Sequence, residues 1–159
     1  MEFKLTLSDT ERSVDLETSL ILARHPSETQ EHLVLRALAW CLWHVEGIEP
    51  GPGLSDGDAA DVIAKDPTGR TTLWIECGAT SWDKLRRVVR QNSGARVVAF
   101  FAEARKKATL LAEIEAEPKP PKELSSIDVA LVDEALVRAL AADEARRHKW
   151  TITVVPGHL

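Results

Sequence analysis

The sequence predicts one α/β domain over residues 1–159, with a mixed central β-sheet flanked by helices and antiparallel strands at its N-terminus. Three observations support this class. The chain of 159 residues is 44% hydrophobic, which suffices for one sizeable core and leaves too little for two independent domains. Short apolar, β-branched segments alternate with longer segments of helical spacing. A turn-forming tetrapeptide near the middle of the chain joins two strand-like runs, which predicts an antiparallel hairpin.

The N-terminal part of the chain is predicted to form two strands and a helix. Residues 3–7 alternate apolar and polar side chains, and a longer strand ends at Ala23. The helix begins near His25-Pro26-Ser27, because proline is favoured in a first turn and Ser27 is followed three residues later by a glutamine, as in a capping box. It extends to about Val45. The composition of residues 46–60, rich in Gly, Pro and Asp, predicts a loop.

The central hairpin is predicted from its turn, Asp66-Pro67-Thr68-Gly69, which has the residue preferences of a type I turn. Its two strands are residues 61–65 and 70–76. If the first and last turn residues pair, Asp61 lies opposite Trp74, and Glu76 is diagonal to Asp61 on the same face. A one-residue bulge would put the two carboxylates on opposite faces.

The C-terminal half continues the alternation of helices and strands. The predicted elements are a helix at 81–91, a buried strand at 95–101, a polar helix at 104–116, an extended proline-rich connection at 117–122, a strand at 127–132, a helix at 133–146 and a strand at 150–155.

Composition excludes some classes of protein. The net charge of −5 argues against a dedicated nucleic-acid coat protein, because phosphate binding depends on Lys and Arg. No stretch reaches the roughly 18 apolar residues of a membrane helix, and the N-terminus lacks a signal-peptide pattern, so we expect a cytoplasmic protein without membrane association. Cys41 and Cys77 lie in apolar runs, which fits a reducing compartment. The oligomeric state is left open.

The hairpin carboxylates predict a cation site. Asp61 and Glu76 reach inward from diagonal positions and can meet at one hard divalent ion such as Mg²⁺, which selects oxygen ligands. A third carboxylate, Glu31, precedes Leu35 by four residues on the apolar stripe of the first helix. On a buried face Glu31 needs a partner, and a cation, an arginine or solvent at the sheet edge would each serve.

The helix that follows Glu76 is basic. Lys84 lies in its first turn, Arg86 and Arg90 are four residues apart, and Arg87 is adjacent to this ridge. Cations beside paired carboxylates can neutralise them, orient a water or stabilise charge on a phosphate. The first two roles need no catalysis.

Two segments resemble the signatures of the bacterial YaeQ proteins. The first is Leu22-Ala23-Arg24-His25-Pro26-Ser27-Glu28-Thr29-Gln30-Glu31, continued by Leu35-Arg36-Ala37-Leu38-Ala39-Trp40. The second is Leu73-Trp74-Ile75-Glu76-Cys77-Gly78 with the basic helix after it. The order of elements is similar over about residues 1 to 155, although only these two stretches are specific.

The resemblance implies a restriction-endonuclease-like core of the PD-(D/E)xK nuclease-like superfamily, with a helix packed on a mixed sheet and a Mg²⁺ or Mn²⁺ site. It assigns metal ligation to Glu31, Asp61, Glu76 and the backbone carbonyl of Cys77. The lysine expected two residues after the second strand acid is replaced by Gly78. In relatives without that lysine a basic residue of the next helix can take over, which makes Lys84 the first substitute and Arg86 the second. Arg24, Arg87 and Arg90 would then contact nucleic acid.

Each of these residues also has a simpler interpretation. Asp61 and Glu76 are ordinary strand carboxylates if one lies near an entrance and the other pairs with Arg70 or Lys84. Glu31 can complement the positive end of its helix, and the basic helix can be a solvated face. Arg24 can pair with Glu28 or Glu31 or bind a phosphate. His25 and His32 are expected to be structural, because neither has zinc-like spacing with a cysteine.

Three functional hypotheses follow. The first is a divalent-metal-dependent nuclease that hydrolyses nucleic acid with Asp61 and Glu76 on the metal. The second is a non-catalytic module that keeps the nuclease-like fold and binds nucleic acid or a protein. The third assigns the acids to stability alone.

Overall fold

The computed structural model describes residues 1–53 and 56–155 as two β-sheets and four α-helices. One sheet has the strand order β2-β1-β8 and consists of β1 (Glu2–Asp9), β2 (Val14–Ile21) and β8 (Arg147–Val154). The other has the order β3-β4-β5-β6-β7 and consists of β3 (Ile48–Pro50), β4 (Val62–Lys65), β5 (Thr71–Cys77), β6 (Arg96–Phe101) and β7 (Ile127–Leu131). The helices are α1 (Gln30–Leu42), α2 (Trp82–Gln91), α3 (Ala104–Glu115) and α4 (Glu134–Ala141), and a 3-10 helix, η2, spans Lys122–Ser126.

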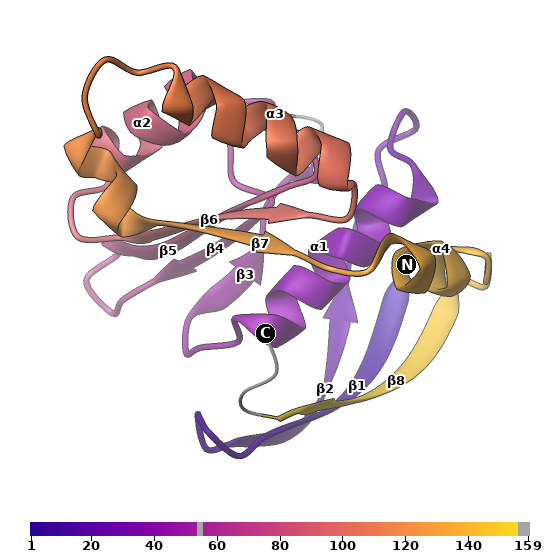
Figure 1. Ribbon diagram of the computed structural model, residues 1–159. Coiled ribbons are helices and arrows are strands. Elements are labelled where there is room, and N and C mark those ends of the chain that lie inside the picture. The colour runs from indigo at the N-terminus through magenta and orange to yellow at the C-terminus, as the bar shows by residue number, and fades with distance from the viewer. Residues whose placement is uncertain (54–55, 156–159) are drawn as a thin grey trace.

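These elements stack in layers. Helix α1 lies between the two sheets, while α2 and α3 cover the opposite face of the five-stranded sheet (Figure 1). The first core contains α1, the inner face of the small sheet and one face of the large sheet; the second lies under α2 and α3. The predicted mixed α/β class, with N-terminal antiparallel strands and flanking helices, is confirmed.

The small sheet joins the two ends of the described chain. Strand β1 pairs antiparallel with β2 and parallel with β8, so that Glu2 lies opposite Arg147. Phe3, Leu5 and Leu7 alternate inward and are buried. The last helix is shorter than predicted: it ends at Ala141, with Ala142 as its C-cap, and β8 begins at Arg147.

Helix α1 begins later than predicted. Its N-cap is Thr29, whose hydroxyl accepts a hydrogen bond from the His32 N–H at 3.2 Å. Ser27 instead contacts the His25 ring, with 2.7 Å between Ser27 Oγ and His25 Nδ1. The proposed capping box at Ser27 is therefore wrong, and Glu28 lies in the turn before the helix, buried at 1% exposure.

The hairpin forms as predicted but in another register. Ile63, rather than Asp61, lies opposite Trp74, and an irregularity falls between Ala64 and Lys65. The two-residue shift preserves the alternation of faces, whereas a one-residue slip would reverse it. Strand β3, in the segment expected to be a loop, pairs Ile48–Pro50 with β4. Three residues are too few to give a strand pattern, so this strand depends on its partner.

The remaining elements agree closely with expectation. Ser81 caps α2 by accepting from the Lys84 N–H at 3.2 Å, and α2 ends at Gln91. Strands β5, β6 and β7 run parallel, which brings their carboxyl ends to one edge of the sheet. Within the described residues, no helix combines the length and the apolar character needed to cross a membrane.

Candidate functional site

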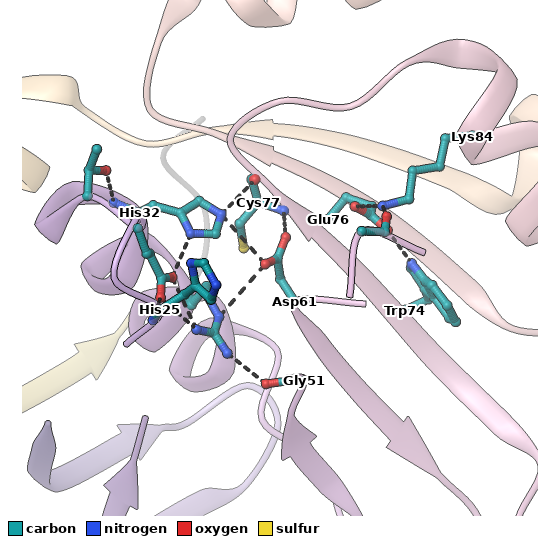
Figure 2. A network of polar contacts seen from close by, with 12 residues as sticks. His25, His32, Gly51, Asp61, Trp74, Glu76, Cys77 and Lys84 are labelled. Atoms are coloured by element: carbon teal, nitrogen blue, oxygen red, sulfur yellow. Dashed lines mark hydrogen bonds and ion pairs between the residues drawn. The ribbon is translucent and has the colours of Figure 1, made fainter. Parts of the chain in front are cut away.

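A pocket of about 220 Å³ opens at the carboxyl end of β5, beside the start of α1 and the first turn of α2. The side chains of His32, Asp61, Glu76 and Lys84 line it together with Cys77. Figure 2 shows these residues converging from α1, from the residue before β4, from β5 and from α2. The two carboxylates expected to share a site therefore do share one pocket.

Asp61 is fixed by contacts on both of its oxygens. Oδ2 accepts a hydrogen bond from the Cys77 N–H at 2.7 Å, while Oδ1 lies 3.5 Å from His32 Nε2 and 3.8 Å from Arg36 Nε. Burial raises the pKa of Asp61, and the charges of His32 and Arg36 with the Cys77 hydrogen bond offset only part of that rise. Burial therefore destabilises the ionised form of Asp61, and a nearby cation would stabilise it.

Glu76 lies on the other side of the pocket and is 3% exposed. Oε1 accepts from Trp74 Nε1 at 2.7 Å, and Oε2 lies 2.8 Å from Lys84 Nζ. Burial raises the pKa of Glu76, Lys84 and Trp74 oppose this, and the charge of Asp61 raises it further. The two carboxylates therefore repel each other across the pocket.

Lys84 reaches the pocket because the Ser81 cap places it in the first turn of α2. Besides contacting Glu76, its ammonium donates to the Gly57 carbonyl at 2.8 Å. Its side chain is 19% exposed. Lys84 therefore lies in the pocket beside Glu76, while its role as the substitute for the missing lysine stays a prediction.

A second group of charges, missed by the sequence analysis, lies behind Asp61. Glu28 Oε1 is 2.7 Å from His32 Nδ1 and 3.1 Å from Arg36 Nη1. Arg36 also donates to the Gly51 carbonyl at 2.7 Å, and its side chain is 1% exposed. Glu28 thus joins His32 to Arg36, and Arg36 in turn reaches Gly51.

The two titratable members of this group shift in opposite directions. Burial alone would raise the pKa of Glu28, but the His32 hydrogen bond and the Arg36 charge lower it overall. Burial alone would lower the pKa of His32, but the Glu28 hydrogen bond and the Asp61 charge raise it overall. Both shifts favour the charged forms. The spacing of four aligns only His32 and Arg36 on one face of α1, because Glu28 precedes the N-cap Thr29.

The prediction that Glu31 faces the core is wrong. Its side chain is exposed and lies outside the pocket. Helix α1 is buried from Leu33 to Cys41 without a break because it lies between two sheets. A helix apolar on all sides has no stripe that fixes its rotation, so the pattern could not say which acid faces inward. The acid that is buried at the start of α1 is Glu28.

The predicted arginines do not line this pocket, and each has a partner within the chain. The ion pairs are Arg86 with Asp83 (3.0 Å) and Glu117 (3.2 Å), Arg87 with Asp58 (3.4 Å) and Arg90 with Glu123 (2.9 Å). Arg24 donates to the Glu28 carbonyl at 3.0 Å, and the Arg86 guanidinium lies 5.7 Å from the centroid of the Trp82 ring. Arg86 is thus directed away from the two carboxylates.

The donor set suits a divalent cation only in part. Asp61, Glu76 and the Cys77 carbonyl supply oxygen atoms, as Mg²⁺ and Mn²⁺ prefer. Among residues 1–53 and 56–155, however, no three side chains of His, Cys, Asp or Glu are grouped to hold a metal ion. Lys84 also occupies one oxygen of Glu76, and the Cys77 carbonyl oxygen lies 3.2 Å from His32 Nε2. An ion here would use the backbone carbonyl and water, and would displace existing contacts.

Fold and pocket together define a mixed α/β protein with a charged pocket at the carboxyl edge of its larger sheet. The chain belongs to the YaeQ family, since the family model described as "YaeQ protein" matches residues 1–159.

Relatives in sequence agree with this assignment. The YaeQ protein of Salmonella typhi is 33% identical over 100 residues, and that of Escherichia coli (strain K12) is 35% identical over 97 residues. These matches cover 63% and 61% of this chain, but only 55% and 52% of the two relatives. The chain thus matches about half the length of each.

Solved structures extend the similarity to nearly the whole chain. The crystal structure of the YaeQ protein from Pseudomonas syringae has a TM-score of 0.81 at 28% identity, and it covers 97% of this chain and 82% of its own. The YaeQ protein from Xanthomonas axonopodis pv. citri has a TM-score of 0.83 at 28% identity, with 98% and 85% covered.

Proposed function

We propose that this chain binds a divalent cation, Mg²⁺ or Mn²⁺, at Asp61, Glu76 and the Cys77 carbonyl and hydrolyses phosphodiester bonds of nucleic acid. The observation that carries the proposal is the pocket shared by these groups and the Lys84 ammonium. In this interpretation α1 and the five-stranded sheet correspond to a restriction-endonuclease-like core. Glu31 and Arg86, predicted as catalytic, have no part in it, because neither lies in the pocket.

Electrostatics support a cation in this pocket. Burial raises the pKa of both Asp61 and Glu76, which means that their charged forms are incompletely compensated. A divalent ion between them would offset both the burial and their mutual repulsion. Lys84 supplies one positive charge to Glu76 without reaching Asp61 at ion-pair distance.

The replacement of the expected lysine by Gly78 also has a structural reason. Gly78 has φ +83°, a conformation that side chains rarely adopt, and a Cβ built there would lie 3.4 Å from His32 Cδ2. A lysine at this position would be strained by this backbone conformation, while its Cβ would be in van der Waals contact with the histidine. The ammonium of Lys84, carried by the next helix, reaches Glu76 instead.

Each group then has a defined role. A bound cation would polarise the phosphate and lower the pKa of a coordinated water. Lys84 would orient that water or neutralise a phosphate oxygen. Asp61 keeps Oδ2 on the Cys77 N–H, which holds its carboxylate in a fixed orientation and leaves Oδ1 toward the pocket.

A second candidate is a non-catalytic module that binds nucleic acid or a protein. The observation in its favour is charge balance: Glu28, Asp61 and Glu76 face His32, Arg36 and Lys84 within one connected region. A site whose charges are already paired can be stable without a metal.

Metal-dependent cleavage separates the two candidates. The wild type and the isosteric variants Asp61→Asn and Glu76→Gln would be assayed on labelled single- and double-stranded DNA and RNA with Mg²⁺ or Mn²⁺. The matched control is Asp128→Asn, which removes an exposed carboxylate paired with Arg96. We expect metal-dependent cleavage by the wild type and by the control, with loss in both pocket variants.

Equal cleavage by the double variant Asp61→Ala/Glu76→Ala would expose a contaminant and refute the assignment. Retention of an oligonucleotide by the wild type without cleavage would favour the non-catalytic module.

A further inference from the structure

The imidazole of His32 is held between a buried carboxylate and two oxygen atoms of the pocket (Figure 2). Its Nδ1 lies 2.7 Å from Glu28 Oε1, and its Nε2 lies 3.2 Å from Cys77 O and 3.5 Å from Asp61 Oδ1. Nδ1 carries a hydrogen, because an ionised carboxylate can only accept. A bare lone pair on Nε2 would be repelled by both oxygens. The position facing them therefore requires a positive species, either a proton or a metal ion.

The separations match those of neighbouring ligands around one ion. Nitrogen and oxygen ligands bind transition ions at about 2.0–2.2 Å, so two ligands at roughly 90–110° lie about 3.0–3.5 Å apart. The distances from Nε2 to the Cys77 and Asp61 oxygens, 3.2 Å and 3.5 Å, fall in this range. An ion would displace the contact between His32 Nε2 and Cys77 O, while Asp61 would keep the hydrogen bond from the Cys77 N–H that fixes its carboxylate.

The contacts behind His32 have the form found behind metal-bound histidines. Such a histidine usually donates its other ring N–H to a carboxylate, which fixes the tautomer and the ring orientation. Glu28 has this position, with its side chain fully buried, and Arg36 Nη1 holds the same oxygen at 3.1 Å. This arrangement leaves Nε2 directed toward the pocket.

We propose that His32 Nε2 is a metal ligand together with Asp61 and the Cys77 carbonyl, and that Glu28 and Arg36 act as positioning residues for it. The inference rests on the proposed function and deepens it. A nitrogen ligand makes the site less suited to Mg²⁺, because Mg²⁺ selects oxygen ligands whereas imidazole is a ligand of first-row transition ions. Mn²⁺, the weakest binder of that series, serves here as the paramagnetic probe.

Pulsed electron paramagnetic resonance of bound Mn²⁺ tests the ligand directly. We expect the wild type to show a hyperfine coupling to a histidine nitrogen that changes when histidine is isotopically labelled. His32→Gln should lose this coupling and bind Mn²⁺ about tenfold or more weakly by calorimetry, with a smaller change for Mg²⁺. Glu28→Gln should weaken Mn²⁺ binding about 10- to 100-fold while keeping the coupling.

The matched control is His25→Gln, which removes a neighbouring imidazole that contacts Ser27. It should keep both the coupling and the affinity. If His32→Gln fails to fold, the coupling in the labelled wild type still decides the question.

The possible failures are distinguishable. Mn²⁺ bound without nitrogen coupling, or a coupling retained in folded His32→Gln, overturns the inference and leaves the proposed function standing. Absence of Mn²⁺ binding by the wild type overturns both. Nitrogen-coupled Mn²⁺ in a protein that cleaves no oligonucleotide supports the inference and refutes the proposed catalysis.

Discussion

Replacement of Arg36 by methionine should destabilise the protein strongly. The side chain is 1% exposed, contacts the buried Glu28 at 3.1 Å and approaches Asp61 at 3.8 Å. Methionine fills a similar volume but leaves both carboxylates without this charge. Breaking a buried ion pair by removing one partner costs about 3–5 kcal/mol. For a chain of this size we expect a fall in Tm of roughly 6–20 °C.

The measurement is urea and thermal unfolding of the wild type, Arg36→Met and a surface control. Arg96→Met removes an arginine that is 58% exposed and pairs with Asp128, so we expect a loss of about 0–1 kcal/mol. Adding Glu28→Gln to Arg36→Met should recover part of the loss, because it removes one of the uncompensated charges. The reasoning would be refuted if Arg36→Met lost no more free energy of unfolding than Arg96→Met.

Four further predictions concern the pocket, the charges behind it and helix α1. Gly78→Ala should lower the free energy of unfolding by about 1–3 kcal/mol in chemical denaturation because of its positive φ, and an unchanged value would contradict this. Glu28 has a lowered pKa, so its stabilisation is present above the usual glutamate range and is lost as pH falls through the lowered value; Glu28→Gln should flatten the acid side of a pH–stability curve. His32 has a raised pKa, so its stabilisation is present below the usual histidine range and is lost as pH rises through the raised value. If the free energy of unfolding of His32→Gln had the same pH dependence as that of the wild type in this range, the prediction would be wrong. Burial raises the pKa of Cys41 to about 12, so native protein at pH 8 should resist alkylation by iodoacetamide at Cys41, while unfolded protein reacts; mass spectrometry of the labelled peptide decides.

Local chemistry explains the parts of the fold that the sequence predicts well. The turn at Asp66 is stabilised by its own carboxylate, which accepts from the Thr68 and Arg70 N–H groups, so four residues suffice to predict the hairpin. The register of its strands differs from the expected one by two residues: one arises at the turn, where the Asp66 N–H pairs with the Arg70 carbonyl, and one at the irregularity between Ala64 and Lys65. Strand β3 depends on pairing with β4, which a local pattern cannot reveal.

The candidate site also has one part that the sequence predicts and another that depends on tertiary packing. Asp61 and Glu76 come from one hairpin, and the placement of both in one pocket followed from strand geometry alone. The contact between His32 and the Cys77 carbonyl joins residues far apart in sequence and depends on how α1 is rotated between the sheets. That rotation is set by packing on two sides, so Glu31 and Glu28 could not be told apart from the helix pattern.

The pairing of β1 with β8 has a consequence for folding. Until β8 is in place, the small sheet is only the hairpin of β1 and β2, and an isolated two-stranded hairpin is marginally stable in water. The β8 partner of Glu2 is Arg147, so this contact joins residues that are separated by almost the whole described chain. Such a long-range contact is expected to be slow to form. During synthesis on a ribosome, one side of α1 would therefore remain exposed until β8 has been made. The hydrophobic face of the hairpin would be exposed for the same time and would be available for a chaperone to bind.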